Sequence, residues 1–136
     1  LHAVDALKRS GITADLIDLR SVAPIDWTII QESVKKTGRL LALDISHQTC
    51  SVSSEIVARV AAEQFGNLKC APRQIALSYC PSPTSYGLTT GYYPGAFEIS
   101  EAVIEMVRGR SGATAMNELK RSAPHDVPGN WFKGPF

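Results

Sequence analysis

The spacing of apolar residues along this chain changes between two patterns, one typical of helices and one typical of strands. Apolar residues recur at helical spacing in four stretches, which predicts helices over about residues 1–9, 27–37, 52–65 and 97–108. Three shorter apolar stretches lie between these helices and predict strands, at 14–19, 39–44 and 73–79. Strands and helices that alternate through short connections are typical of a parallel sheet covered by helices on both faces. We therefore predict an α/β fold, a three-layer α/β/α sandwich around a mostly parallel, twisted sheet.

Residues at the ends of these stretches support the helix assignments. Asp26 and Ser51 precede the second and third helices, where a side-chain oxygen can accept hydrogen bonds from free backbone N–H groups. Gly11 and Gly38 follow the first and second helices, and glycine is a common helix stop. The first helix starts at Leu1 with no capping residue before it, so we expect the chain to be a piece of a longer protein.

Two apolar faces indicate where the core lies. The stretch 39–44 is continuously apolar at its centre, which predicts a strand covered on both faces. In the last helix, Ile99, Val103, Met106 and Val107 form one stripe that we expect to face inward.

The composition changes after residue 108. We predict one α/β domain over 1–108 and a tail over 109–136 that is rich in glycine, proline and serine. The tail carries Trp131, Phe132 and Phe136, and a purely disordered tail rarely holds three large aromatic residues so close together. We expect these residues to anchor the tail against a surface and to contribute about 1.5–3 kcal/mol each when buried.

Size and charge exclude some classes of protein. The chain has 136 residues and a net charge of +1, which gives no electrostatic case for nucleic acid or an anionic membrane. No apolar run approaches the roughly 20 residues that a membrane span needs. Cys50, Cys70 and Cys80 are odd in number and far apart, so we expect reduced cytoplasmic thiols that are buried as small apolar side chains.

The residue types needed for catalysis are present without a strong pattern. Asp44, His47 and Ser51 lie in one loop, but no nucleophile elbow surrounds the serine, and a capping serine with a solvated histidine is the favoured interpretation. No spacing of metal ligands and no glycine-rich nucleotide loop occurs. Two alternatives stay open, a hydrolase that uses Cys50 or Ser51 and a free-standing, flavodoxin-like ligand-binding domain with its crevice near 46–54.

A long loop before the last helix is rich in tyrosine and proline. Tyr86, Tyr92 and Tyr93 are candidates for a protein interface, because amphipathic aromatic side chains suit such surfaces. Packing of these tyrosines onto their own domain is the alternative. Arg20 ends the first strand, where it pairs either across a subunit boundary or with a neighbouring acid.

Three runs carry a resemblance to a known family: "IDLRSVAPIDWTIIQESVKKTGRLLALD", "SSEIVARVAAEQFGNLKCAPRQI" and "PSPTSYGLTTGYYPGAFEISEAV". They resemble the C-terminal domain of transketolase-like enzymes. The most similar members are the β subunits of the thiamin-diphosphate-dependent decarboxylating component of 2-oxo acid dehydrogenase complexes, of the pyruvate, branched-chain or acetoin type. The resemblance covers nearly all of residues 1–108.

The resemblance implies a role in assembly. Such enzymes oxidatively decarboxylate a 2-oxo acid with thiamin diphosphate and Mg, held outside this domain, and pass the acyl group to a lipoyl acyltransferase. No catalytic, cofactor-binding or metal-binding residue carries over to this chain. The implied partners are the α subunit, a second β subunit in a heterotetramer and the acyltransferase core. An acetoin dehydrogenase, a transketolase or a deoxyxylulose-phosphate synthase are the alternatives within this class of enzymes.

The family usually has an edge strand before the first helix, and this chain begins at that helix. The resemblance therefore implies an exposed sheet edge, or a homodimer that covers it.

Overall fold

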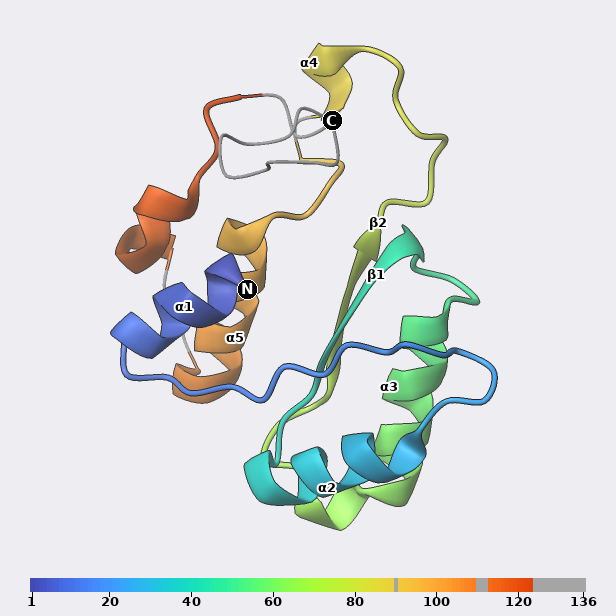
Figure 1. Ribbon diagram of the computed structural model, residues 1–136. Coiled ribbons are helices and arrows are strands. Elements are labelled where there is room, and N and C mark those ends of the chain that lie inside the picture. Colours follow the sequence, from blue (N-terminus) through green and yellow to red (C-terminus); the bar gives the residue numbers. More distant parts are fainter. Residues whose placement is uncertain (90, 110–112, 124–136) are drawn as a thin grey trace.

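The computed structural model describes residues 1–89, 91–109 and 113–123 (Figure 1). Its helices and strands follow the predicted order, except at the strand predicted for 14–19. In chain order they are α1 (His2–Arg9), α2 (Trp27–Thr37), β1 (Leu41–His47), α3 (Val52–Glu63), the short 3-10 helix η1 (Phe65–Asn67), β2 (Arg73–Leu77), α4 (Tyr86–Thr89), α5 (Ala96–Arg108) and the 3-10 segment η2 (Ala113–Leu119).

The two strands form a parallel sheet, as predicted. Leu41 lies opposite Arg73 and Leu43 lies opposite Ile75, and the register shifts after Leu43. The Arg73 N–H donates to the Leu40 carbonyl at 2.9 Å, which begins the ladder. Figure 1 shows α1 and α5 on one side of this sheet and α2 and α3 on the other.

The predicted strand at 14–19 is wrong. In the described chain the sheet contains β1 and β2 alone, and residues 13–19 run extended without strand pairing. A strand exists only where its backbone groups bond to a neighbouring strand. Here the segment is held by side chains, since Asp15 accepts hydrogen bonds from Lys36 and Ser33 of α2.

Three of the predicted helix ends are confirmed, whereas α3 ends at Glu63, two residues before its predicted end. The Asp26 carboxylate accepts from the Thr28 N–H at 3.0 Å and caps α2. Gly38 ends the same helix with a φ of 71°, a conformation that glycine adopts without the clash that a Cβ atom brings. The Ser51 hydroxyl accepts from the Ser54 N–H at 3.1 Å and caps α3.

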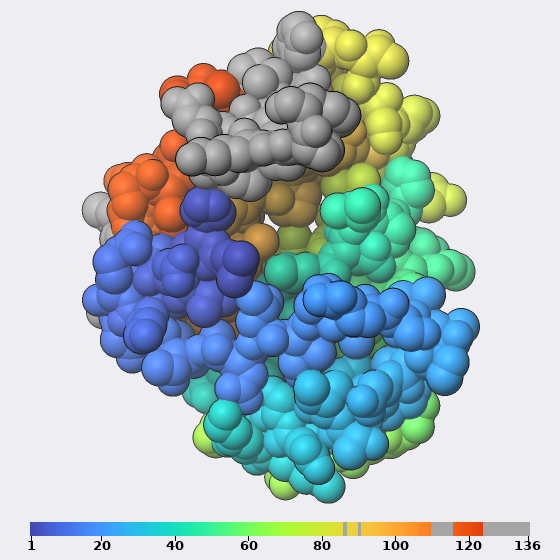
Figure 2. All heavy atoms as spheres, in the orientation of Figure 1, coloured from blue at the N-terminus to red at the C-terminus, as the bar shows by residue number. Residues whose placement is uncertain are grey.

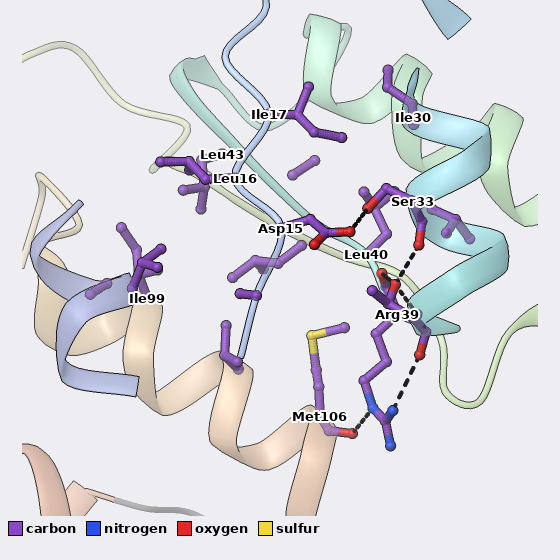
Figure 3. Close-up of a pocket in the computed structure, with 18 of the residues that line it drawn as sticks. Asp15, Leu16, Ile17, Ile30, Ser33, Arg39, Leu40, Leu43, Ile99 and Met106 are labelled. Atoms are coloured by element: carbon purple, nitrogen blue, oxygen red, sulfur yellow. Dashed lines mark hydrogen bonds between the residues drawn. The ribbon is translucent and has the colours of Figure 1, made fainter. Parts of the chain in front are cut away.

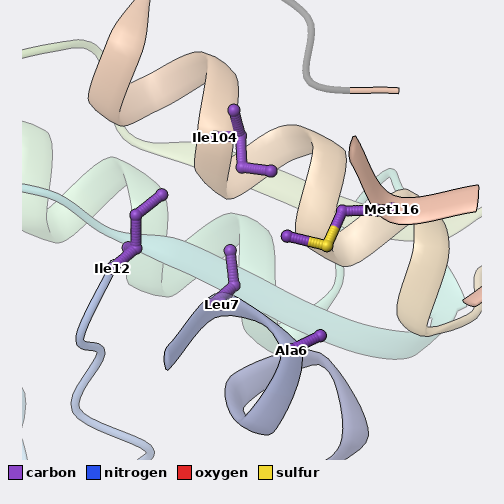
Figure 4. Close-up of a cluster of buried hydrophobic side chains, with 5 residues drawn as sticks. All are labelled: Ala6, Leu7, Ile12, Ile104 and Met116. Carbon is purple, nitrogen blue, oxygen red and sulfur yellow. The ribbon is translucent and has the colours of Figure 1, made fainter. Parts of the chain in front are cut away.

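The core consists of two clusters on opposite sides of the sheet. The first joins α1, α5 and η2, and Figure 4 shows its members, Ala6, Leu7, Ile12, Ile104 and Met116. Met116 is completely buried although it lies in the predicted tail. The second cluster joins α2, α3 and β1 through Ile30, Val34, Ala42, Ile56 and Val60.

Two of the expected inward faces are incompletely covered. Leu43 of β1 is 49% exposed and Ile45 is 88% exposed, so this strand is not covered on both faces. In α5 the buried positions are Ser100, Ala102 and Ile104, while most of the predicted apolar stripe is only half-buried and Val107 is exposed. The helix therefore turns that stripe toward a space that the described chain leaves unfilled.

Candidate functional site

The loop between β2 and α5 carries the tyrosines that the sequence singled out. Tyr92 is 7% exposed, and its hydroxyl donates to the Cys80 carbonyl at 3.2 Å. The rings of Tyr92 and Tyr93 meet edge to face with centroids 4.8 Å apart, and Tyr93 is half-buried. The Tyr86 backbone begins α4, and its side chain lies outside the described atoms. The burial of Tyr92 favours packing within its own domain, and an interface role for this loop stays a prediction.

Arg20 lies at the end of the extended segment, where the sequence places it. Its Nε donates to the Asp18 carboxylate at 3.0 Å, and the two side chains are 91% and 77% exposed. Such an exposed pair contributes little to stability. The guanidinium therefore stays accessible to a partner. Trp131, Phe132 and Phe136, the predicted tail anchors, lie outside the described residues.

Polar side chains gather where β1 ends and α3 begins. The Ser51 hydroxyl bonds to the Ser53 hydroxyl at 2.9 Å, and the Gln74 side chain donates to both at 2.8 and 2.7 Å. The Asp44 carboxylate accepts from the Ser46 N–H at 2.9 Å and the Ser53 N–H at 3.2 Å. These groups satisfy one another and fix the start of α3 to both strands.

The charge state of Asp44 follows from these bonds. Partial burial raises the pKa of the carboxyl, but hydrogen bonds from Ser46 and Ser53 outweigh it and hold the pKa below its ordinary value of 3.8. The carboxylate is therefore ionised at neutral pH, beside the α3 N-terminus.

The three candidates for a catalytic triad are not assembled as one. The ring Nδ1 of His47 contacts the Ser78 carbonyl at 3.0 Å, while Ser51 and Asp44 make the capping bonds described above. This arrangement supports the capping interpretation. Cys50 and Cys80 are exposed and Cys70 is partly exposed, so the expectation of three buried cysteines is wrong.

The arrangement at the α3 N-terminus does not fit a diphosphate cofactor. A helix N-terminus attracts anions through its free N–H groups. Here a serine hydroxyl and an ionised carboxylate already accept from those groups, and the carboxylate repels an added phosphate. Within the described ranges, no group of three or more histidine, cysteine or acidic residues could hold a metal ion. None of the described helices is long and apolar enough to span a bilayer.

A hollow in the described structure lies between the extended segment 13–19 and β1. It is a cavity of about 850 Å³ with helices on both sides (Figure 3). One wall comes from α2 and α3, including Ile30 and Ile56, and the other from α1 and α5, including Leu7 and Val103. Figure 2 shows the surface hollowed between α1, in dark blue, and the green residues of β1 and its following loop.

Together these features define a mixed α/β domain whose polar groups at the strand ends are used for capping. The chain belongs to the transketolase C-terminal domain family, whose model matches residues 1–96. This confirms the resemblance drawn from the three sequence runs.

The similar proteins are β subunits. The chain is 35% identical over 109 residues to the acetoin:2,6-dichlorophenolindophenol oxidoreductase subunit beta of Cupriavidus necator, covering 80% of this chain and 32% of that subunit. It is 32% identical over 117 residues to the Bacillus subtilis subunit with the same description, covering 86% and 33%. It is 35% identical over 103 residues to the pyruvate dehydrogenase E1 component subunit beta of Rhizobium meliloti, covering 76% and 22%. The chain thus spans a third or less of these relatives' length.

Sequence reasoning missed the cavity and the role of Gln74. A glutamine inside the short apolar run "RQIAL" was the available signal for a partly buried polar contact. The cavity was harder to predict. The apolar stripe of the last helix indicates that this face is directed inward, but it does not indicate which element covers the face.

Proposed function

We propose that this chain is the C-terminal assembly domain of the β subunit of an oxidative decarboxylase that acts on a 2-oxo acid or on acetoin. The complete enzyme uses thiamin diphosphate and Mg, bound on other domains, and transfers the acyl group to a lipoyl acyltransferase. Within that enzyme the domain contacts the α subunit and a second β subunit. Its sheet is completed there into a three-layer sandwich.

One observation carries this proposal. Relatives of two different enzymes, an acetoin oxidoreductase and a pyruvate dehydrogenase, match the same chain at 35% identity, and both are β subunits. The shared feature is therefore the subunit type and not one substrate. The first two of these relatives are acetoin enzymes, which favours acetoin as the first substrate to test.

The geometry supports a role in assembly. The capping bonds of Ser51 and Asp44 leave the α3 N-terminus without a free anion site, which favours cofactor binding elsewhere in the enzyme. Arg20 presents an exposed guanidinium, and Tyr93, a second interface candidate, is half-buried. We propose that these two residues contact other subunits, together with the tail residues Trp131, Phe132 and Phe136.

The test is reconstitution of the complete enzyme. The full polypeptide that contains this chain is co-expressed with its α subunit, and the complex is measured by light scattering behind a sizing column. We expect a heterotetramer that reduces 2,6-dichlorophenolindophenol with acetoin or a 2-oxo acid only when thiamin diphosphate and Mg are added. Failure to bind any α subunit, together with saturable binding of a phosphate-bearing ligand to this chain alone, would favour a free-standing ligand-binding domain.

A second experiment tests the tail. Because Met116 is part of the core, the chain should be cut after residue 123 and not after residue 108. If the tail anchors assembly, the solution mass of the complex falls on removal of 124–136 while the unfolding curve of the domain stays unchanged. Equal loss of stability and assembly would show that the tail packs on its own domain.

A further inference from the structure

The end of α3 reverses the usual placement of polar and apolar side chains. Gln64, which follows the last residue of α3, is 5% exposed, and the next residue, Phe65, is 81% exposed. Val60 belongs to the core, and Gln64 continues the same face of the helix because it lies four residues further on. A glutamine is therefore buried where an apolar side chain is expected, and an aromatic ring is left in solvent. Departures of this kind gather at functional or strained sites.

Hydrogen bonds compensate for the burial of Gln64 and fix the chain around Phe65. The Gln64 side-chain amide donates to the Gln31 side chain of α2, and its side-chain carbonyl accepts from the Asn67 side chain at 2.8 Å. Gln31 in turn donates to the carboxylate of Glu63. Residues just before and just after Phe65 are thus bound to α2 or to one another. The ring is therefore presented to solvent by a backbone that is fixed in place.

Two lysines lie at the same end of the molecule as Phe65. Lys69 follows Phe65 by four residues, and its N–H donates to the Gly38 carbonyl at 2.8 Å. Its side chain lies against Gly38, since a Cβ atom added at Gly38 would be 2.8 Å from Lys69 Cγ. Lys35 lies one turn after Gln31 on the same face of α2. Figure 1 shows the short segment after α3 beside the end of α2.

The charge around Phe65 is net positive. Lys35 and Lys69 are exposed, and neither forms an ion pair with an acid of the described chain. The carboxylate of Glu63 is already used, because it accepts from Arg59 Nε at 2.7 Å and from the Gln31 side chain. Glu32 is the other acid on this part of α2 and lies about 100° around the helix from Gln31. Two ammonium groups therefore accompany one unpaired carboxylate.

We propose that Phe65, Lys35 and Lys69 form a docking surface for an acidic segment of another protein that carries one large apolar side chain among its carboxylates. An aromatic side chain on a fixed backbone suits the centre of an interface, because little conformational freedom is lost on binding. The lysines select carboxylates and orient the segment. The surface lies where β2 begins, whereas the tyrosine loop follows the end of β2, so it is distinct from the contacts proposed above.

The test is a binding assay with a defined probe. The full polypeptide that contains this chain is titrated into a fluorescein-labelled peptide in which one tryptophan stands between two pairs of glutamates, and fluorescence anisotropy gives Kd. We expect Phe65→Ala to weaken binding about tenfold or more. The double variant Lys35→Glu and Lys69→Glu should weaken binding of this peptide and gain binding of the same peptide with lysines in place of its glutamates.

Two matched variants control for exposure and charge. Tyr79 is an aromatic residue that is also 81% exposed, and Lys8 is an exposed lysine of α1. We expect Tyr79→Ala and Lys8→Glu to leave Kd unchanged. Phe65→Ala should also leave the urea midpoint of unfolding unchanged, because the ring is in solvent. A lower midpoint would show that the ring packs on its own polypeptide and would overturn the proposal.

Three other results would overturn the proposal. The first is the absence of saturable binding up to about 1 mM peptide, and the second is an equal Kd for Phe65→Ala and the unchanged protein. The third is a solution mass that falls in Phe65→Ala while the peptide fails to bind the unchanged protein, because a second copy then covers the ring. The assay needs no α subunit, so its failure is distinct from failure of the proposed function.

Discussion

Replacing Tyr92 distinguishes packing from interface function in the loop before α5. Tyr92→Phe removes only the hydroxyl, which donates to the Cys80 carbonyl at 3.2 Å and lies 3.3 Å from the Ser82 hydroxyl. Both contacts are long for bonds of this kind, and Cys80 is exposed, so water can replace the lost donor. We therefore expect a loss of about 0.5–1 kcal/mol in the free energy of unfolding.

Tyr92→Ala also removes the aromatic ring, and Tyr92 is only 7% exposed. Truncation of a buried aromatic side chain costs about 3–5 kcal/mol, because its apolar contacts are lost and a cavity remains. Urea unfolding, followed by tryptophan fluorescence and circular dichroism, measures both variants. Tyr79→Ala is the matched control, since Tyr79 is 81% exposed and we expect little change in stability.

The same variants are then carried in the full polypeptide and tested for assembly with the α subunit. If Tyr92 serves packing, Tyr92→Phe leaves assembly unchanged and Tyr92→Ala reduces assembly only as far as it reduces folding. A Tyr92→Ala loss below about 1 kcal/mol, combined with loss of assembly, would refute the burial seen here and restore the interface interpretation.

Three further changes test other parts of the structure. Gly38→Ala should cost about 1–2 kcal/mol in urea unfolding, because φ is 71° and the added Cβ lies 3.0 Å from a backbone oxygen, whereas Gly66→Ala should be tolerated. Ser51→Ala should cost about 1 kcal/mol by removing the α3 cap, and a loss near zero would contradict the capping role. Asp15→Asn should lower stability above pH 3.8 and flatten its decline below that pH, while Asp18→Asn should change neither.

The sign of the Asp15 effect follows from its partners. Hydrogen bonds from Lys36 and then Ser33 hold the pKa of the folded carboxyl below its ordinary value of 3.8. The ionised form therefore stabilises the fold above that value, and this contribution is lost as the pH falls through the lower folded pKa. The variant lacks the charge, so its stability curve should lack this part of the acid decline.

Local signals in the sequence were sufficient for most of the fold. Asp26, Gly38 and Ser51 each act through backbone groups within a few residues, so the sequence alone predicted their roles. The parallel pairing of β1 and β2 followed from the alternation of elements. The order of the strands across the sheet did not follow from the alternation. The period of the apolar residues identifies a segment as a strand, but it does not indicate which segment lies beside that strand.

Exposure was predicted less well than element type. The stretch "LLAL" is apolar, yet Leu43 is half-exposed because the space beside it is unfilled. Tyr92 shows the opposite case, a tyrosine from an irregular loop that is buried. Composition gives the affinity of a side chain for an apolar environment, but tertiary structure decides whether that environment is present.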